Sequence, residues 1–252
     1  MTGGGAGIGR ATVELFVEHG ATVHVAENDP DLVDDLGTLE GVTAHRVDVR
    51  DADAVAELAA GLGPPDVVVN NVGDHRPSKR FAESDTSSWQ AMYEVNLLHV
   101  MAVTRHFLPS MIDRGRGSIV NVHSVEGVRG YPGDPVYAAM KAAVAHFTTS
   151  LAAGVGRHGI RVNGVGPDLT QTPQVDYLRR ARDRDTDAWR NWAPVGRVGW
   201  PSEVARTVLF LASDLASFVT GHNVPVDGGT LAMGGWVWSD RAERFVNRPT
   251  VE

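Results

Sequence analysis

The sequence of 252 residues contains no cysteine, which excludes disulfide bonds and thiolate metal sites. No apolar run reaches membrane-spanning length. The net charge of −8 argues against nucleic acid or an anionic membrane surface as a main partner. Histidine and glutamate show no metal-ligand spacing, so no metal site is predicted. We therefore expect a cytoplasmic globular protein with no nucleic-acid or membrane partner.

Composition and alternation of segments predict the fold class. The 42% hydrophobic and 21% charged residues are ordinary for a globular protein, and the length suits one domain spanning 1–252. Strand-like and helix-like segments alternate, as a parallel sheet with helices on both faces requires. We expect a single doubly wound Rossmann-type α/β domain, with strands near 21–26, 43–47, 66–70 and 119–122 and helices near 11–19, 30–36 and 52–62.

A glycine-rich run, Thr2-Gly3-Gly4-Gly5-Ala6-Gly7-Ile8-Gly9, precedes the helical pattern that begins at residue 11. Glycines allow a tight turn close to a phosphate, and a helix N-terminus offers free N–H groups and a positive dipole end. A flexible leader is the alternative interpretation. The helix and strand that follow at once favour a nucleotide site.

Tyr137 and Lys141 stand four residues apart on an expected helix, with Ser124 thirteen residues upstream of the tyrosine. This spacing places the ammonium beside the phenol, where a positive charge favours the phenolate. Ser124 is positioned to hold a carbonyl or alcohol oxygen. Chance pairs of this kind are common, but lysine is otherwise scarce: the only other one is Lys79.

Together these motifs resemble the short-chain dehydrogenase/reductase family over nearly the whole chain. Further matches are Asn70-Asn71-Val72-Gly73, Asn96, the segment from Gly117 to Ser124, Arg161 to Pro167, and Val226-Asp227-Gly228-Gly229. The resemblance implies Tyr137 as general acid/base, Lys141 lowering its pKa and binding the nicotinamide ribose, Ser124 orienting the substrate, and Asn96 holding a relay water. It implies cofactor binding by Gly3, Gly7, Ile8, Gly9, Asp48, Val49, Asn71, Gly73, Tyr137, Lys141, Pro167 and Thr172.

Glu27 decides the cofactor prediction. It stands where the family places an acidic residue against the adenosine ribose, and a carboxylate there repels the 2′-phosphate of NADP. Ala6 stands where a basic residue would bind that phosphate. A surface carboxylate without a ligand is the alternative interpretation. We predict NAD, with NADP less favoured.

The N-terminus departs from the family pattern. The family has an apolar first strand before the glycine motif, whereas here only Met1 precedes Thr2, so the first strand is missing or truncated. We hypothesise that the natural protein begins upstream and that a GTG valine codon was read as the start. A truly shortened protein, impaired or stabilised by a partner, is the alternative.

The resemblance implies an NAD-dependent oxidoreductase that transfers hydride to or from a hydrophobic or ring-containing secondary alcohol or ketone. Alternatives are an NADPH-dependent 3-oxoacyl-thioester reductase and a non-catalytic nucleotide-binding regulator. Family members commonly form tetramers, so we expect a homo-oligomer, tetramer or dimer. We assign a substrate loop to 173–200 and a tail to 230–252. The aromatic residues of these two segments are Tyr177, Trp189, Trp192, Trp236 and Trp238. Four residues that follow the motif strands are expected to face the cleft: His75, Arg76, Glu126 and Arg129. His123 is expected to pack in the core, and Asp168 replaces a glycine of the family pattern.

Overall fold

The computed structural model describes residues 1–76, 78–180, 193–234, 236–239 and 242–247. The strands are β1 (Val23–Glu27), β2 (Val42–Arg46), β3 (Val67–Asn70), β4 (Gly117–Val122), β5 (Ile160–Pro167), β6 (Asn223–Val226), β7 (Val237–Ser239) and β8 (Arg244–Val246). The α-helices are α1 (Gly7–Glu18), α2 (Pro30–Gly37), α3 (Ala52–Leu62), α4 (Thr86–Tyr93), α5 (His99–Arg114), α6 (Pro135–Val155), α7 (Tyr177–Arg180) and α9 (Pro201–Ala212). Shorter helical turns include η2 (Glu94–Leu98) and η3 (Val125–Gly127).

Strands β1 to β6 form a parallel arrangement in two parts, while β7 and β8 form a separate antiparallel hairpin. One part has the order β1-β2 and the other β3-β4-β5-β6, with every neighbouring pair parallel. Thr2 lies between the two parts: it forms a parallel bridge to Ala26 and donates its N–H to the carbonyl of Val69 at 3.0 Å. The N-terminal residues therefore connect β1 and β3 only at Thr2, where a full strand would join the two parts of the sheet.

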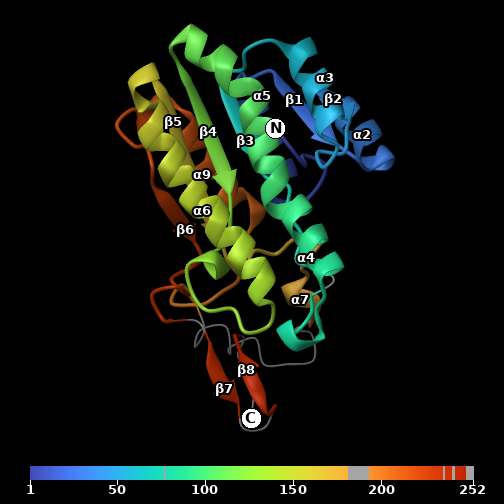
Figure 1. Cartoon of the computed structure of the whole chain (residues 1–252), viewed down its shortest axis with the longest axis vertical. Coiled ribbons are helices and arrows are strands. Elements are labelled where there is room, and N and C mark those ends of the chain that lie inside the picture. Colours follow the sequence, from blue (N-terminus) through green and yellow to red (C-terminus); the bar gives the residue numbers. More distant parts are fainter. Residues whose placement is uncertain (77, 181–192, 235, 240–241, 248–252) are drawn as a thin grey trace.

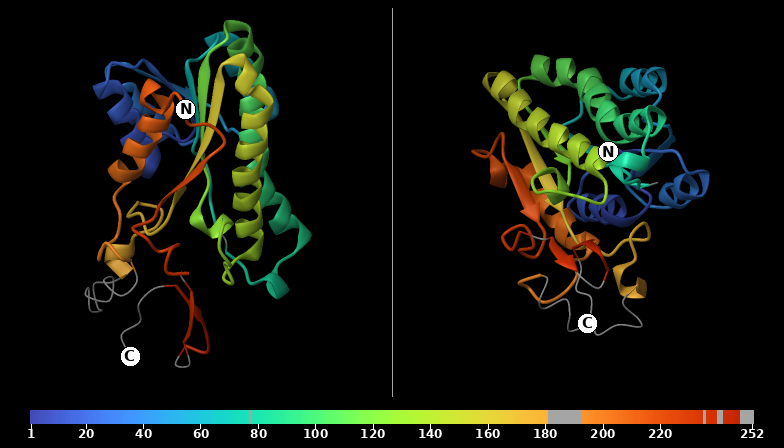
Figure 2. Two further views of the ribbon diagram at one scale, coloured as in Figure 1. Left: turned by 90° about the vertical axis from the view of Figure 1, so that its left-hand side faces the viewer. Right: turned by 60° about the horizontal axis from the view of Figure 1, so that its bottom comes forward.

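Helices cover both faces of the sheet (Figure 2). α1 and α9 pack together on one face, while α5 and α6 lie on the other and α3 packs against α5. Both faces of β4 are consequently buried: Ile119 belongs to one core cluster and its neighbour Val120 to the other. This explains the continuous apolar run of the strand, which is typical of parallel sheets. The predicted α/β architecture is confirmed.

Most expected element bounds agree with the structure to within two residues, but α1 begins earlier than predicted. The helix begins at Gly7 rather than near residue 11, and its N-cap, Ala6, provides no side-chain hydrogen bond. The usual capping signal is therefore missing, and the first N–H groups of the helix have no side-chain cap. Within the described residues, every helix is too short or too polar to cross a membrane.

Candidate active site

Tyr137 and Lys141 project from the N-terminal half of α6. The helix is capped by Asp134, whose Oδ1 accepts the backbone N–H of Tyr137 at 3.0 Å, and Pro135 occupies its first turn. One turn later, Nζ of Lys141 lies 5.7 Å from the centroid of the Tyr137 ring. The same ammonium donates to the carbonyl of Val122, at the end of β4, at 3.4 Å. The predicted pair is thus assembled at the carboxyl end of the sheet.

Ser124 lies just beyond the end of β4, opposite this pair. Its hydroxyl caps η3 by accepting the N–H of Glu126 at 3.2 Å, and it lies 3.5 Å from the carbonyl of Pro167 at the end of β5. These contacts orient Oγ toward the space in front of Tyr137. Adjacent parallel strands bring their carboxyl ends to one edge of the sheet, and this explains why Ser124 and Pro167, 43 positions apart in the chain, meet here.

Burial controls the protonation of the two catalytic candidates. It raises the pKa of the Tyr137 phenol above its ordinary value, while a hydrogen bond with Ser124 acts in the opposite direction. Burial also lowers the pKa of Lys141 to about 8, with the charge of Asp74 partly restoring it. Burial is the largest influence on the pKa of Tyr137 and favours the protonated phenol. The lowering of this pKa by Lys141, which the resemblance implies, stays a prediction.

Asn96 is fully buried in the π-helical turn η2 and holds the segment beside Lys141. Its Nδ2 donates to the carbonyls of Asp74 at 2.8 Å and Met92 at 3.1 Å, and its Oδ1 accepts the N–H of Asp74 at 3.2 Å. Such π-turns recur at functional sites. The described contacts of Asn96 therefore fix the backbone after β3; a water-binding role in a proton relay stays a prediction.

The glycine loop forms one wall of a cavity of about 500 Å³ at this edge of the sheet. Gly3 and Gly7 have φ angles of +66° and +55°, and a Cβ at Gly9 would lie 1.8 Å from the carbonyl oxygen of Gly3. Only glycine permits that approach. The loop leaves the N-terminus of α1 facing the cavity, and this arrangement suits a pyrophosphate. The shape and lining therefore fit a dinucleotide.

Glu27 lies at the end of β1, on the same wall, with its carboxylate held by backbone N–H groups. Oε2 accepts from Gly5 at 3.0 Å, and Oε1 accepts from Asn28 at 2.9 Å and Asp29 at 3.3 Å. The side chain is fixed rather than loose on the surface. Arg10, by contrast, lies on α1 and pairs with Glu14 and Asp35. The acceptor expected for a ribose hydroxyl is therefore in place.

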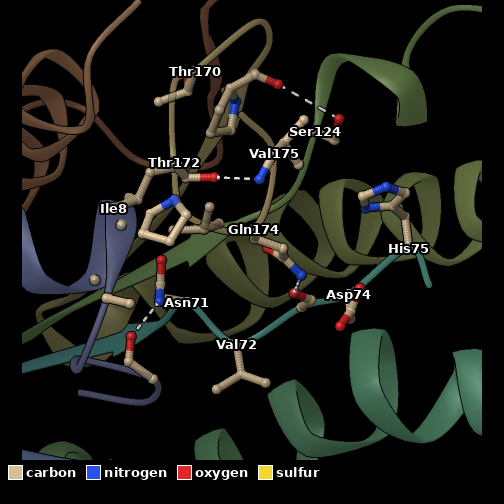
Figure 3. Close-up of a pocket in the computed structure, with 18 of the residues that line it drawn as sticks. Ile8, Asn71, Val72, Asp74, His75, Ser124, Thr170, Thr172, Gln174 and Val175 are labelled. Atoms are coloured by element: carbon tan, nitrogen blue, oxygen red, sulfur yellow. Dashed lines mark hydrogen bonds between the residues drawn. The ribbon is translucent and has the colours of Figure 1, made fainter. Parts of the chain in front are cut away.

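Most predicted cofactor residues line this one cavity (Figure 3). They are Gly3, Gly7, Ile8, Gly9, Glu27, Asn71, Gly73, Tyr137, Lys141, Pro167 and Thr172, together with Ser124. Asp48 and Val49 are not part of this lining: Asp48 pairs with Arg50, and Val49 is buried in a core cluster. Their predicted place beside the adenine stays a prediction. Within the described residues, no cluster of three or more metal-ligating side chains occurs.

Several lining residues were not predicted from the sequence. Asp74 pairs with Arg76, Gln174 donates to the carbonyl of Gly73 at 3.4 Å, and Tyr131 lies edge-on to Tyr137 with ring centroids 6.0 Å apart. Asp74 directly follows the Asn-Asn-Val-Gly motif, so its position in the sequence could have indicated that it lines the site. Tyr131 and Gln174 reach the site from loops, so no periodic pattern marks them.

The remaining cleft candidates divide into two groups. His75, Arg76 and Glu126 line the cavity as expected. His123 also borders it, but is buried against Gly166, where a Cβ would lie 2.7 Å from its ring. Asp168 also borders the cavity, with its carboxylate held by Arg129 and Thr230 at 2.8 and 2.6 Å. Arg129, which was expected to face the cleft, is not part of the lining and is buried against Glu126 and Asp168. Trp189 and Trp192 lie outside the described residues.

Comparison with known proteins identifies the class to which this site belongs. The family model described as Enoyl-(Acyl carrier protein) reductase matches residues 3–230. The 3-oxoacyl-(acyl-carrier-protein) reductase of Thermotoga maritima is 41% identical, covering 91% of this chain and 95% of its own. Cis-4-hydroxycyclohexanecarboxylate dehydrogenase of Sinomonas cyclohexanicum is also 41% identical, with coverage of 92% and 96%.

Solved structures agree with these sequence matches. An oxidoreductase of the short-chain dehydrogenase/reductase family from Burkholderia thailandensis is 34% identical with a TM-score of 0.82, covering 92% of this chain and 91% of its own. ElxO with NADP bound is 28% identical with a TM-score of 0.81 and coverage of 92% and 97%. The chain belongs to the short-chain dehydrogenase/reductase family. It is an oxidoreductase that uses a nicotinamide cofactor.

Proposed function

We propose that this enzyme transfers hydride between NAD(H) and a hydrophobic or ring-containing secondary alcohol or ketone, with Tyr137 as general acid/base. The observation that carries the proposal is the convergence of Ser124, Tyr137 and Lys141 on the cavity that begins at the glycine loop. The Sinomonas relative, named for a ring alcohol, supports the substrate class. The fixed carboxylate of Glu27 supports NAD over NADP.

The nicotinamide, when bound, supplies or accepts the hydride. Glu27, Asn71 and Lys141 would hold the cofactor from the wall formed by β1, β3 and α6, and the N-terminus of α1 would face its pyrophosphate. Lys141 is protonated at neutral pH because its pKa is about 8, so it would be able to donate hydrogen bonds to ribose hydroxyls. Its buried charge would also offset part of the cofactor's negative charge.

Ser124 and Tyr137 act on the substrate oxygen. Ser124 donates a hydrogen bond that orients the carbonyl, and Tyr137 gives its phenolic proton to that oxygen as the carbon is reduced. The raised pKa of Tyr137 keeps the phenol protonated at neutral pH, which suits the direction of reduction. In the direction of oxidation, the same oxygen returns its proton to Tyr137. The site therefore supplies both the orienting donor and the acid.

A second candidate is an NADPH-dependent reductase of 3-oxoacyl thioesters. The name of the Thermotoga relative favours it, and the solved structure of ElxO contains NADP. Glu27 argues against the 2′-phosphate of NADPH. The two candidates differ in cofactor preference and in turnover of an acyl thioester. The predicted cytoplasmic location and homo-oligomeric assembly stay predictions.

The deciding experiment compares the parent with Tyr137→Phe. Tryptophan quenching measures NADH and NADPH binding, and absorbance measures turnover of cyclic ketones, acyclic ketones and a 3-oxoacyl thioester. We expect the parent to reduce cyclic ketones with NADH. Tyr137→Phe should bind NADH with the same affinity but turn over at least 100-fold more slowly. Tyr93→Phe, outside the cavity, is the matched control. Efficient thioester reduction with NADPH would instead establish the second candidate, and full activity of Tyr137→Phe would refute the assigned acid.

A further inference from the structure

A buried ionic cluster lies beside the catalytic serine. Arg129 donates through Nη2 to Oε1 of Glu126 at 3.0 Å and to Oδ2 of Asp168 at 2.8 Å, and through Nε to Oε2 of Glu126 at 3.1 Å. The three side chains are at most 9% exposed. Placing two carboxylates and one guanidinium in the interior costs desolvation energy that pairing seldom exceeds. Stability alone therefore does not account for the cluster.

The cluster connects three parts of the chain that surround the substrate oxygen. Glu126 stands two residues after Ser124, and Asp168 directly follows Pro167 at the end of β5. Oδ2 of Asp168 also accepts the hydroxyl of Thr230 at 2.6 Å. Arg129 thus joins the loop after β4, the turn after β5 and the beginning of the C-terminal segment.

Glu126 also holds the two ends of the C-terminal hairpin. Its Oε2 accepts the indole N–H of Trp236 and its Oε1 accepts Nδ2 of Asn247, both at 3.3 Å. Trp236 stands directly before β7 and Asn247 directly after β8. Figure 1 places this hairpin beyond the carboxyl end of β4. The buried carboxylate therefore anchors a segment more than 100 residues away in sequence.

The anchored tryptophan packs against Tyr131, which lines the cavity next to Tyr137. The ring centroids of Trp236 and Tyr131 lie 5.2 Å apart, and Tyr131 meets Tyr137 edge-on at 6.0 Å. Both Tyr131 and Glu126 line the cavity. Aromatic side chains give large, rigid apolar contact area, and the charges behind them are paired with one another. The rings are inclined to one another, by 52° between Trp236 and Tyr131 and by 71° between Tyr131 and Tyr137, and a rigid aromatic corner of this kind favours a rigid ring over a flexible chain.

We propose that Tyr131 is a specificity-determining residue for ring-bearing alcohols and ketones, and that Trp236 and Arg129 are the positioning residues that hold it, with Arg129 acting through Glu126 on Trp236. The specificity part rests on the proposed function; the positioning part rests on the contacts of Arg129, Glu126 and Trp236. Loss of the indole removes the support of Tyr131 without touching the catalytic trio. Loss of the guanidinium releases the hairpin and leaves two buried carboxylates unpaired.

The kinetic test uses cyclohexanone and 2-hexanone, which have the same number of carbon atoms, with NADH as the reductant. For Tyr131→Leu and for Trp236→Leu we expect kcat/KM for cyclohexanone to fall at least tenfold, mainly through KM, while 2-hexanone changes less than twofold. NADH affinity stays at the parent value. Trp236→Phe, which retains an aromatic ring but loses the N–H, is expected to recover part of the preference. Equal losses for both ketones, or parent kinetics, in Tyr131→Leu would overturn its specificity role, and parent kinetics for Trp236→Leu would overturn the positioning role of the indole.

The positioning role is tested by hydrogen exchange, which needs no turnover. Arg129→Met is expected to speed exchange in residues 230–247 but not in β6, and Arg129→Lys should restore part of the protection. Arg197→Met, which breaks the exposed pair with Glu203, is the matched control. Unchanged exchange in Arg129→Met would overturn the role. If Arg129→Met fails to fold, Asn247→Ala provides the same readout. A parent without activity on any ketone would refute the proposed function and the specificity claim, but the exchange result would still decide the positioning claim.

Discussion

Gly73 lies directly against the ammonium of Lys141: a Cβ atom at position 73 would lie 2.5 Å from Nζ and 3.1 Å from Oδ1 of Asn96. The glycine that ends the Asn-Asn-Val-Gly motif therefore leaves the space in which the lysine sits. Asn96 holds the next residue, Asp74, through both its amide oxygen and its amide nitrogen. The backbone after β3 consequently determines where the lysine charge is placed relative to Tyr137.

Gly73→Ala is predicted to displace Lys141 and to impair the site. Because a small misplacement of a catalytic group is costly, we expect turnover to fall roughly 100-fold, with weaker NADH binding. Circular dichroism and the melting temperature would establish that the fold is retained. Gly130→Ala is the control, since a Cβ there meets open space. Parent-like turnover of Gly73→Ala would show that the lysine has another acceptable position.

Glu27 is predicted to set the preference for NADH over NADPH. Like charges brought together in a binding site cost several kcal/mol, so Glu27→Gln should narrow the ratio of the two dissociation constants by roughly 10-fold or more. The glutamine side chain has a similar shape to glutamate. Its NH2 group is a donor, however, so it cannot accept every backbone N–H of Gly5, Asn28 and Asp29 that the carboxylate accepts. Titrations with both cofactors provide the ratio, and the exposed Glu40→Gln is the control. A parent that binds NADPH more tightly would contradict the assignment.

His123 is predicted to make the protein sensitive to acid. Burial lowers its pKa to about 4, and the charge of Lys141 adds to this effect. The unfolded chain, with an ordinary histidine pKa of about 6.5, then binds more protons than the folded chain between these values. The free energy of unfolding therefore falls as the pH falls from about 6.5 to 4, by up to about 3 kcal/mol from this residue.

Urea unfolding at pH 7, 6 and 5 measures this effect. His123→Asn should lose less stability over the interval than the parent does, even if it is less stable at pH 7. His99, whose pKa burial also lowers to about 4, retains its own share in both proteins. His19→Gln, at an exposed position, is the control. An identical slope for parent and His123→Asn would remove His123 as a source of acid sensitivity.

Local sequence patterns predicted most of the fold and the centre of the site. Apolar runs and glycine punctuation located the strands, because both faces of a parallel sheet are buried. The four-residue spacing of Tyr137 and Lys141 predicted their shared helix face. The sequence could not predict that Arg129 pairs with Asp168 or that Glu126 contacts Asn247, because these contacts join loops far apart in sequence. The raised pKa of Tyr137 also needed the three-dimensional burial of the phenol, which spacing alone does not provide.

The junction between β1 and β3 leads to a prediction about stability. A second cavity of about 500 Å³ lies there, and its lining includes Phe16, Val23, Leu58, Leu62, Val67 and Phe107 from both halves of the sheet. The amino group of Met1 reaches its edge, donating to the carbonyl of His24 at 2.7 Å, and burial lowers its pKa to about 6. This second cavity, which we call the slot, therefore combines an apolar lining with the edges of β1 and β3.

An apolar β-forming segment of four or five residues, fused to Met1 and in line with it, is predicted to stabilise the protein. Each buried Val or Leu contributes about 2 kcal/mol, and ordering each added residue costs about 1–2 kcal/mol. We expect a net gain on the order of 2 kcal/mol, or a melting temperature about 5 °C higher. A Ser- and Asp-rich extension of equal length is the matched control, because it replaces the charged amino group without filling the slot. An apolar extension that melts with the parent, or with the polar control, would show that the slot does not accept a strand.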